Sequence, residues 1–321
     1  MVKIGFLINL INVRGTTQAS YDYALYNELI LKNTSIIFAP YSAQHDTTMI
    51  MLFKEKFPIF FYKDISNLDN IIVREECDIL YIIKYGKTDD FTSNIIKTII
   101  HCVFDMSEPH GNVYAAVSEN LAKKYNNSIF VPHMISLKQS KYSYNFRFYL
   151  NIPQDALVFG RYGGEDTFNI PFVKEIIKII VNSYPNVYFL FANTPEFYNH
   201  KQIIHLQKIF GNDEKNRFIS TCDAHLEAND LGHTFGLACG EFSINNKPII
   251  LYNGYVWNTA HFDIIKDKGI YFKTPEEFYN IITSWKKQDY EGKDWNCYKD
   301  YNPENVMLKF KQVFIDNISL N

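Results

Sequence analysis

The chain has 321 residues, about twice the size of one typical hydrophobic core, so its length predicts two domains of roughly 150 residues each. Its residues are 47% hydrophobic and 21% charged, a composition that excludes an intrinsically disordered protein. The formal net charge is −3, and no basic run is long enough to follow a phosphate backbone. A dedicated nucleic-acid-binding protein is therefore disfavoured.

The cysteines and the N-terminal residues indicate the cellular compartment of such a protein. The five cysteines lie far apart and form no C-x-x-C pair, which favours buried free thiols over a zinc knuckle or a disulfide framework. A short apolar run within residues 1–12 resembles the core of a signal peptide, but no small-residue cleavage site follows it. We therefore expect the first strand of a cytoplasmic protein. No stretch approaches the roughly 18 apolar residues of a membrane-spanning helix, so no integral membrane segment is expected.

Short apolar runs alternate with segments of helical period along the chain, a pattern typical of parallel sheets covered by helices on both faces. The first helix is expected over residues 17–31, where Thr17 can cap the start and apolar residues recur at i, i+3 and i+4 spacing. The strands expected in the first half of the chain are residues 4–10, 35–39, 59–62, 79–83, 97–104 and 113–117.

A second alternation of the same kind follows a polar and aromatic stretch at residues 136–156 that has no clean period. We therefore predict an α/β protein with an N-terminal Rossmann-like domain at 1–150, a C-terminal Rossmann-like domain at 151–302, and a last helix within 303–321 that can cross back to the first domain. The elements expected in the second half are strand 157–160, helix 171–183, strand 187–191, helix 200–210, strand 217–220, helix 236–243, strand 248–251 and helices near 274–286 and 303–317.

The strongest local signal is the segment from Gly232 to Phe242, which reads GHTFGLACGEF. A glycine-flanked turn here runs into a helix, whose first free N–H groups can hold a diphosphate. Glu241, farther along the same helix, can accept hydrogen bonds from ribose hydroxyls. Spacing alone leaves an ordinary loop-to-helix junction with a solvated Glu241 equally open.

This segment resembles the donor-binding motif of retaining GT-B glycosyltransferases, in which two glutamates separated by seven residues bracket a Gly-Phe-Gly turn. Glu241 matches the second glutamate, so the resemblance implies that it binds the donor ribose. His233 stands in the place of the first glutamate, which in the family contacts donor sugar hydroxyls and the charge developing at C1. The segment whose backbone faces the diphosphate and the sugar corresponds to Thr234, Phe235, Gly236 and Leu237.

A second segment, FGRYGG, directly follows the first strand of the second domain and resembles a Gly-Arg segment that contacts the nucleotide phosphates in this family. Arg161 would supply a charge-assisted contact, while Gly163 and Gly164 would let the backbone approach closely. A lysine that the family carries about five residues later is absent. A surface salt bridge is the alternative interpretation of Arg161. Asn193, after the next strand, is either a base or phosphate contact or a turn residue.

In the first domain, the loop after the first strand contains Gly15 and Thr16, at the place where GT-B enzymes put a glycine-containing loop near donor phosphate and acceptor. Asp22, in the following helix, is either an acceptor ligand or a complement to the helix N-terminus. The family also has a histidine that lines the catalytic centre after a central strand of this domain. His110 and His101 both qualify, and one of them is expected to be a core or loop histidine held by backbone groups.

The resemblance implies transfer of a sugar, with retention of configuration, from a nucleotide-diphosphate sugar to a hydroxyl acceptor such as a glycan. The sequence has no Asp-x-Asp pair of the kind that holds Mg²⁺ or Mn²⁺, so we expect neither a metal nor another cofactor. Two alternatives stay open. One is hydrolysis by the carboxyl groups of Glu165, Asp166 and Glu241. The other is an inactive protein that binds a sugar nucleotide or carbohydrate, for which His233 is the evidence.

Overall fold

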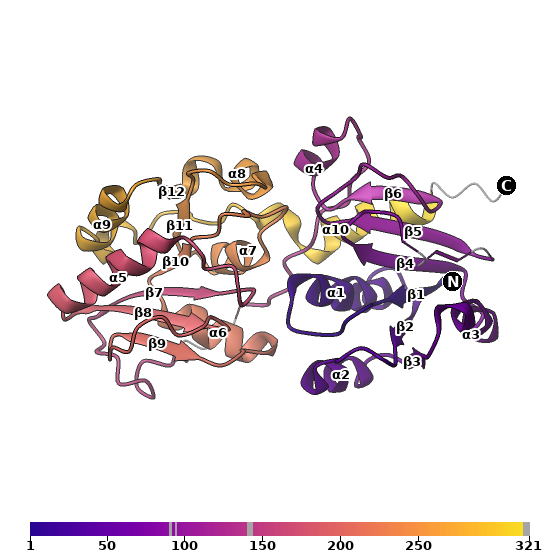
Figure 1. Ribbon diagram of the computed structural model, residues 1–321, viewed down its shortest axis with the longest axis horizontal. Helices are drawn as coiled ribbons and strands as arrows, with labels where there is room; N and C mark the ends of the chain where they lie inside the picture. The colour runs from indigo at the N-terminus through magenta and orange to yellow at the C-terminus, as the bar shows by residue number, and fades with distance from the viewer. Residues whose placement is uncertain (90–91, 94, 140–143, 317–321) are drawn as a thin grey trace. The chain divides into compact units, whose positions relative to one another are not determined.

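The computed structural model describes residues 1–89, 92–93, 95–139 and 144–316 (Figure 1). The chain divides into two compact units: unit 1 is Met1–Ser136 together with the segment from Tyr301 onward, and unit 2 is Leu137–Asp300. The boundary thus falls earlier than the expected residue 150. The reason is that the stretch before residue 150 packs on unit 2, where the Phe146 amide donates to Thr221 Oγ1 at 2.8 Å.

Unit 1 is built on a parallel sheet with the strand order β3-β2-β1-β4-β5-β6. This is the order of a doubly wound Rossmann fold, in which the direction of strand addition reverses between β1 and β4. The strands are β1 (Lys3–Leu7), β2 (Thr34–Pro40), β3 (Ile59–Tyr62), β4 (Ile79–Lys84), β5 (Lys97–Cys102) and β6 (Val113–Ala116), and the helices are α1 (Gly15–Leu29), α2 (Thr47–Lys54), α3 (Leu68–Arg74), α4 (Glu119–Lys124) and α10 (Pro303–Phe310).

Helix α10 comes from the far end of the chain yet packs against α1 of unit 1. The Phe310 ring lies 5.3 Å from Tyr23 of α1 and 5.4 Å from Tyr81 of β4, measured between ring centroids. Phe314, one turn later, lies 5.2 Å from the His101 ring of β5. Each of these buried aromatic side chains removes enough apolar surface from water to stabilise unit 1 by about 1.5–3 kcal/mol.

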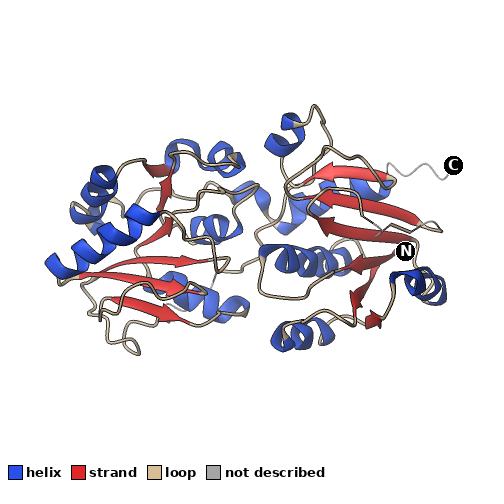
Figure 2. Ribbon diagram, in the orientation of Figure 1, coloured by secondary structure: helices blue, strands red, loops and turns tan. Residues whose placement is uncertain are grey.

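Unit 2 repeats the architecture with the strand order β12-β11-β10-β7-β8-β9, so β7 and β10 occupy the places that β1 and β4 hold in unit 1. Figure 2 shows the strands and helices of both units. The strands are β7 (Leu157–Tyr162), β8 (Val187–Ala192), β9 (Ile203–Leu206), β10 (Ala224–Glu227), β11 (Ile249–Tyr252) and β12 (Gly269–Phe272), and the helices are α5 (Pro171–Ser183), α6 (Gly211–Thr221), α7 (Leu237–Ile244), α8 (Ala260–Ile265) and α9 (Pro275–Thr283).

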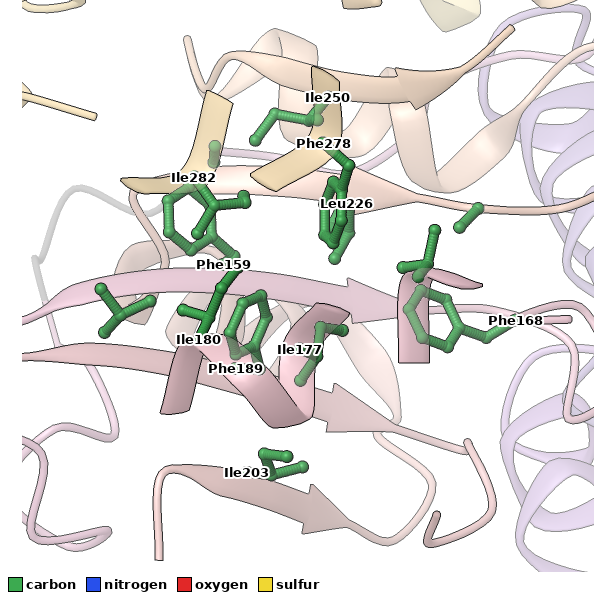
Figure 3. Close-up of a cluster of buried hydrophobic side chains, with 14 of the residues drawn as sticks. Phe159, Phe168, Ile177, Ile180, Phe189, Ile203, Leu226, Ile250, Phe278 and Ile282 are labelled. Carbon is green, nitrogen blue, oxygen red and sulfur yellow. The ribbon is translucent and has the colours of Figure 1, made fainter. Parts of the chain in front are cut away.

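One side of the unit 2 sheet is covered by α5 and α9, which pack against each other (Figure 3). Helix α5 begins with Pro171 in its first turn, where the missing N–H costs nothing. Ile177 and Ile180 of α5 reach the sheet and meet Phe159 of β7 and Phe189 of β8 in one buried cluster. The apolar spacing along residues 171–183 therefore identified this helix with its observed bounds.

Two elements predicted for unit 2 are wrong. The predicted helix at 200–210 is instead strand β9, and the predicted strand at 217–220 lies inside helix α6. The run around Ile203 and Ile204 has apolar residues at both helical and strand spacing, and pairing with β8 decides for the strand. Helix α6 opens at Gly211, whose φ of +67° suits glycine, and carries two acidic residues in its first turn.

Two further expectations concern membranes and thiols. Among the described residues, no helix combines the length and the apolar character that crossing a membrane requires. All five cysteines are free; Cys77, Cys102, Cys222 and Cys239 are buried, and Cys297 is half-buried. The prediction of free thiols is confirmed.

Candidate functional site

In unit 2 the strand order reverses between β7 and β10, and ligands of open α/β sheets bind outside the carboxyl ends of the strands at such a point. Three segments meet there: the loop after β7, the turn after β8, and the loop from β10 into α7. The Asn193 side chain after β8 donates to the Gly163 carbonyl after β7 at 2.7 Å. Tyr162 at the end of β7 donates to Glu241 of α7 at 2.7 Å.

Arg161 lies beneath the loop after β7 and is fully buried, so the alternative of a surface salt bridge is excluded. Its guanidinium donates to Thr194 Oγ1 at 2.5 Å, to the Gly164 carbonyl at 2.9 Å and to Thr167 Oγ1. Its Nε has no hydrogen-bond partner among the described residues. Burial lowers the pKa of Arg161, while the Glu227 carboxylate acts in the opposite direction. Arg161 therefore holds the backbone of the loop after β7 in place.

A Cβ at position 163 would lie 2.9 Å from Nη2 of Arg161, so glycine leaves room here for the buried guanidinium. Asn193 has a φ of +51°, a left-handed conformation that asparagine tolerates better than most residues. It is thus a turn residue whose side chain also fixes the backbone of the glycine loop. Gly164 and Thr167 complete a short turn through a 2.8 Å hydrogen bond from Thr167 Oγ1 to the Gly164 carbonyl.

Helix α7 starts at Gly236, which has a φ of +86° as the N-cap residue. A Cβ at this position would lie 3.1 Å from the Tyr298 hydroxyl and 3.3 Å from Cβ of His261. No side chain caps the helix start, and its first turn contains no acidic residue. The Tyr298 hydroxyl also donates to the Phe235 carbonyl at 2.7 Å, which fixes the loop just before the helix. The first amide groups of α7 therefore form a fixed, positively polarised end suited to an anion.

Glu241 lies in the interior of α7 and is 6% exposed, so the alternative of a solvated glutamate is excluded. Its two oxygens accept from the Tyr162 hydroxyl at 2.7 Å and from Lys215 Nζ at 2.6 Å. Burial and the adjacent carboxylate raise the pKa of Tyr162 well above its usual value, so its hydroxyl remains a donor. The carboxylate keeps lone pairs that can accept from a further hydroxyl.

Glu227 is a site residue that the sequence analysis missed. It ends β10, is 5% exposed, and places Oε2 3.2 Å from His233 Nε2 and 3.5 Å from His225 Nε2. Its Oε1 has no hydrogen-bond partner among the described residues. Burial raises the pKa of Glu227, but His233, His225 and Arg161 together outweigh burial and hold this pKa well below the usual 4.5. The short run of Ala224–Glu227, in which apolar and titratable residues alternate, was the signal that could have identified it.

One group of described residues could supply metal ligands. His225, Glu227 and Cys239 each have a ligand atom, and these atoms all lie within 4.8 Å of one another. His225 Nδ1 is 3.2 Å from the Gly160 carbonyl, so Nε2 is the ring nitrogen that faces the group. Burial raises the pKa of the Cys239 thiol well above its usual value, which favours the neutral thiol over the thiolate that binds metals. Metal-independent function stays a prediction.

In unit 1, Gly15 and Thr16 form the first turn of α1, whose start also lacks a side-chain cap. Thr17 was expected to cap this helix, but its hydroxyl donates to the Leu10 carbonyl at 3.1 Å and closes the preceding loop. Asp22 is buried and accepts from Gln18 at 3.0 Å and from Ser136 at 2.8 Å. Asp22 is therefore held in place by contacts within unit 1.

The two candidate histidines of unit 1 have different surroundings. His101 is fully buried, with Nδ1 2.6 Å from the Tyr81 hydroxyl and Nε2 2.8 Å from the Val131 carbonyl. Burial lowers the pKa of His101 to about 4, so this side chain is a neutral core histidine. His110 is half-buried, with Nε2 3.0 Å from Lys84 Nζ and Nδ1 2.6 Å from the Glu108 carbonyl. Of the two, His110 is the one that solvent can reach.

Comparison with known proteins finds solved structures of similar fold but no matching sequence family. No family model and no curated protein matches the sequence. A glycosyltransferase from Rickettsia africae has a TM-score of 0.70 at 12% identity over 98% of this chain and 99% of its own. Anabaena HepE in complex with UDP-glucose has a TM-score of 0.66 at 12% identity over 98% of this chain and 96% of its own. WaaG, a glycosyltransferase of lipopolysaccharide biosynthesis, has a TM-score of 0.63 at 8% identity over 97% of this chain and 99% of its own.

The chain has the GT-B fold. The prediction of a GT-B fold with two Rossmann-like units is thereby confirmed, although the sequence identities are too low to carry a function. Apart from Gly15 and Thr16 of unit 1, the expected donor-side residues belong to unit 2, where the described contacts join the end of β7 to α7 and the loop after β7 to the turn after β8. The unit 1 candidates are Gly15, Thr16, His101 and His110, and the unit 2 candidates are Arg161, Gly163, Gly164, Asn193, His233, Thr234, Phe235, Gly236, Leu237 and Glu241.

Proposed function

We propose that this GT-B protein is a cytoplasmic glycosyltransferase that moves a sugar from a nucleotide-diphosphate sugar to a hydroxyl acceptor, with the donor bound by unit 2. The observation that carries the proposal is the construction of α7. Its uncapped start at Gly236 and its buried carboxylate at Glu241 lie on one short helix at the switch point of the sheet. A nucleoside diphosphate presents the two complementary groups, an anion and a ribose diol.

Each part of the donor then has a partner of matching chemistry. The diphosphate is held by the amide groups at the start of α7 and by the glycine loop that Arg161 supports from below. The ribose hydroxyls donate to Glu241, whose position is fixed by Tyr162 and Lys215. These fixed donors also stabilise the charge that develops on the diphosphate as the sugar leaves, because they need no reorganisation during the reaction.

The remaining features of the proposal rest on the resemblance of the GHTFGLACGEF segment to retaining enzymes. We propose retention of configuration, no requirement for a metal, and acceptor binding by unit 1, where His110 is the accessible histidine. The solved structures with this fold also include a UDP-N-acetylglucosamine 2-epimerase, with a TM-score of 0.57. The experiment therefore has to distinguish sugar transfer from epimerisation of the sugar nucleotide and from binding without a reaction.

The test is a thermal-shift titration with UDP, GDP, dTDP, ADP and CMP and their common sugar conjugates, each with and without EDTA. We expect stabilisation by one nucleotide class, unchanged by EDTA. Glu241→Ala and Glu241→Gln should both lower the affinity, by about 10- to 100-fold for the loss of a charged hydrogen-bond acceptor. Gln keeps a partner for Tyr162, which separates lost binding from lost folding. Glu276→Ala, a change at an exposed carboxylate in the first turn of α9, is the matched control and should bind as the wild type does.

The bound conjugate is then incubated with candidate hydroxyl acceptors, and the products are separated by chromatography. Release of the nucleoside diphosphate together with a glycosylated acceptor supports transfer. An altered sugar still attached to the nucleotide would indicate epimerisation, and unchanged conjugate would indicate a binding protein. No stabilisation by any nucleotide would contradict the proposal as a whole.

A further inference from the structure

Among the described residues, the contact between Glu227 and His233 joins the two ends of the loop between β10 and α7. Glu227 closes β10, and His233 lies three residues before the helix start at Gly236. The His233 side chain is 25% exposed, whereas that of Glu227 is 6% exposed. The pair therefore joins a buried carboxylate to an imidazole that solvent and ligands can reach.

The geometry fixes which atoms of His233 face inward and outward. Nε2 of His233 is buried 3.2 Å from Oε2 of Glu227, which is ion-pair distance, although the contact lacks hydrogen-bond geometry. A proton on Nε2 makes this contact favourable, whereas two lone pairs would repel each other at this distance. Among the described residues no hydrogen bond is made by Nδ1, the other ring nitrogen. His261 fixes the backbone at this point, with its Nδ1 3.2 Å from the His233 carbonyl.

The other groups around the pair do not neutralise Glu227 fully. Arg161 of β7 is directed to the glycine loop and to Thr194, and His225 of β10 lies 3.5 Å from the carboxylate without hydrogen-bond geometry. Burial lowers the pKa of His261 of α8 to about 3, so this ring is neutral. Cys239 of α7 is a neutral thiol for the same physical reason. Among the described residues, His233 is thus the group closest to the Glu227 carboxylate that can carry a positive charge.

On the basis of the proposed function, we propose that Glu227 is a positioning residue that holds His233 as an imidazolium, and that Nδ1–H of His233 donates to the diphosphate of the nucleotide donor. A positively charged donor at the start of an uncapped helix complements a diphosphate. The arrangement also explains why a histidine stands where the resembling motif has a glutamate. With Glu227 already in place, a glutamate at position 233 would bring two buried carboxylates together.

The experiment exchanges the two charges and measures folding and binding separately. His233→Glu, Glu227→His and the double exchange are compared by urea unfolding and by calorimetric titration with UDP, uridine and inorganic pyrophosphate. His233→Glu restores the residue of the motif, yet it should lower both stability and UDP affinity. The double exchange should recover stability, because opposite charges face each other again, but not UDP affinity, because position 233 is now negative. His233→Gln should weaken UDP and pyrophosphate by about 10-fold and leave uridine unchanged.

The outcomes separate this proposal from the proposed function. Wild-type protein that binds none of the three probes contradicts both. Wild-type protein that binds UDP, with His233→Gln binding it equally well, overturns the Glu227–His233 proposal alone. Recovery of UDP affinity by the double exchange would also overturn it, because the pair would then have only a structural role. His200→Gln, a change at a half-buried histidine elsewhere in unit 2, is the matched control and should leave UDP affinity unchanged.

Discussion

Units 1 and 2 share one strand order but use the point where that order reverses in different ways. Near this point in unit 1, both ring nitrogens of the buried His101 have partners within the unit, Tyr81 and Val131. At the same point in unit 2, buried atoms of Arg161, His225, Glu227 and His233 have no hydrogen-bond partner among the described residues. The same fold thus holds a neutral, fully paired histidine near one reversal point and incompletely paired charged groups at the other.

This difference between the units indicates where a ligand is expected. Burying a polar atom without a partner costs free energy, so native proteins keep such atoms rare and concentrate them where a function requires them. In unit 2 they lie beneath the loops of the proposed nucleotide site. Three changes test this contrast, in order of expected effect.

The largest effect is expected from the two buried arginines of unit 2. Arg147 is fully partnered, with bonds to the Thr221, Pro153 and Ala156 carbonyls and an ion pair to Asp223. Both Arg147→Met and Arg161→Met should lower the free energy of unfolding by about 3–5 kcal/mol, because each leaves buried partners unpaired. Only Arg161→Met should also abolish UDP binding by the folded protein, measured by titration calorimetry at low temperature. Equal loss of binding in both variants would remove the distinction.

The next effect concerns two glycines that follow corresponding strands, Gly86 after β4 and Gly232 after β10. Both have positive φ, +128° and +59°. A Cβ at Gly86 would lie 1.7 Å from the Asp105 carbonyl oxygen, and one at Gly232 would lie 2.0 Å from that of Asn258. Gly86→Ala and Gly232→Ala should each cost about 2–3 kcal/mol in urea unfolding. Only the Gly232 change should weaken UDP, because its loop carries His233.

The smallest effect is a dependence of stability on pH. The pKa of His101 is about 4 in the folded protein and about 6.5 when unfolded, so the unfolded state takes up the proton first as the pH falls. The resulting loss of stability begins near pH 6.5 and reaches about 2 kcal/mol at pH 5. His101→Gln should make this part of the profile shallower in urea unfolding at several pH values, while the buried His133 and His261 continue to contribute. Glu227 acts in a lower pH range, because its pKa in the folded protein is held well below 4.5. Its contribution to stability is complete above about pH 4.5 and is lost as the pH falls further.

Much of the fold could be predicted from the sequence, because its elements have a clear apolar period. The helix that starts at Pro171 and the strand over Ile59–Tyr62 have the expected bounds. Helix α6 could not be predicted, since its sequence GNDEKNRFIST is mostly polar and buries only a few side chains. In the candidate site, the motif around Glu241 was visible as a pattern. The role of Glu227 was not, because it arises from a loop that brings residues 227 and 233 together.

Helix α10 also determines the order in which the two units can complete their folding. Residues 1–136 leave the ribosome first, but the aromatic side chains of Phe310 and Phe314 that cover Tyr23, Tyr81 and His101 are translated only after all of unit 2. Unit 2 is continuous in sequence and can acquire its native packing while translation proceeds. Unit 1 can therefore be completed only after unit 2 has been translated, and until then Tyr23 and Tyr81 lack the aromatic side chains that cover them in the folded protein. Exposed apolar surface of this kind makes a folding intermediate prone to aggregation.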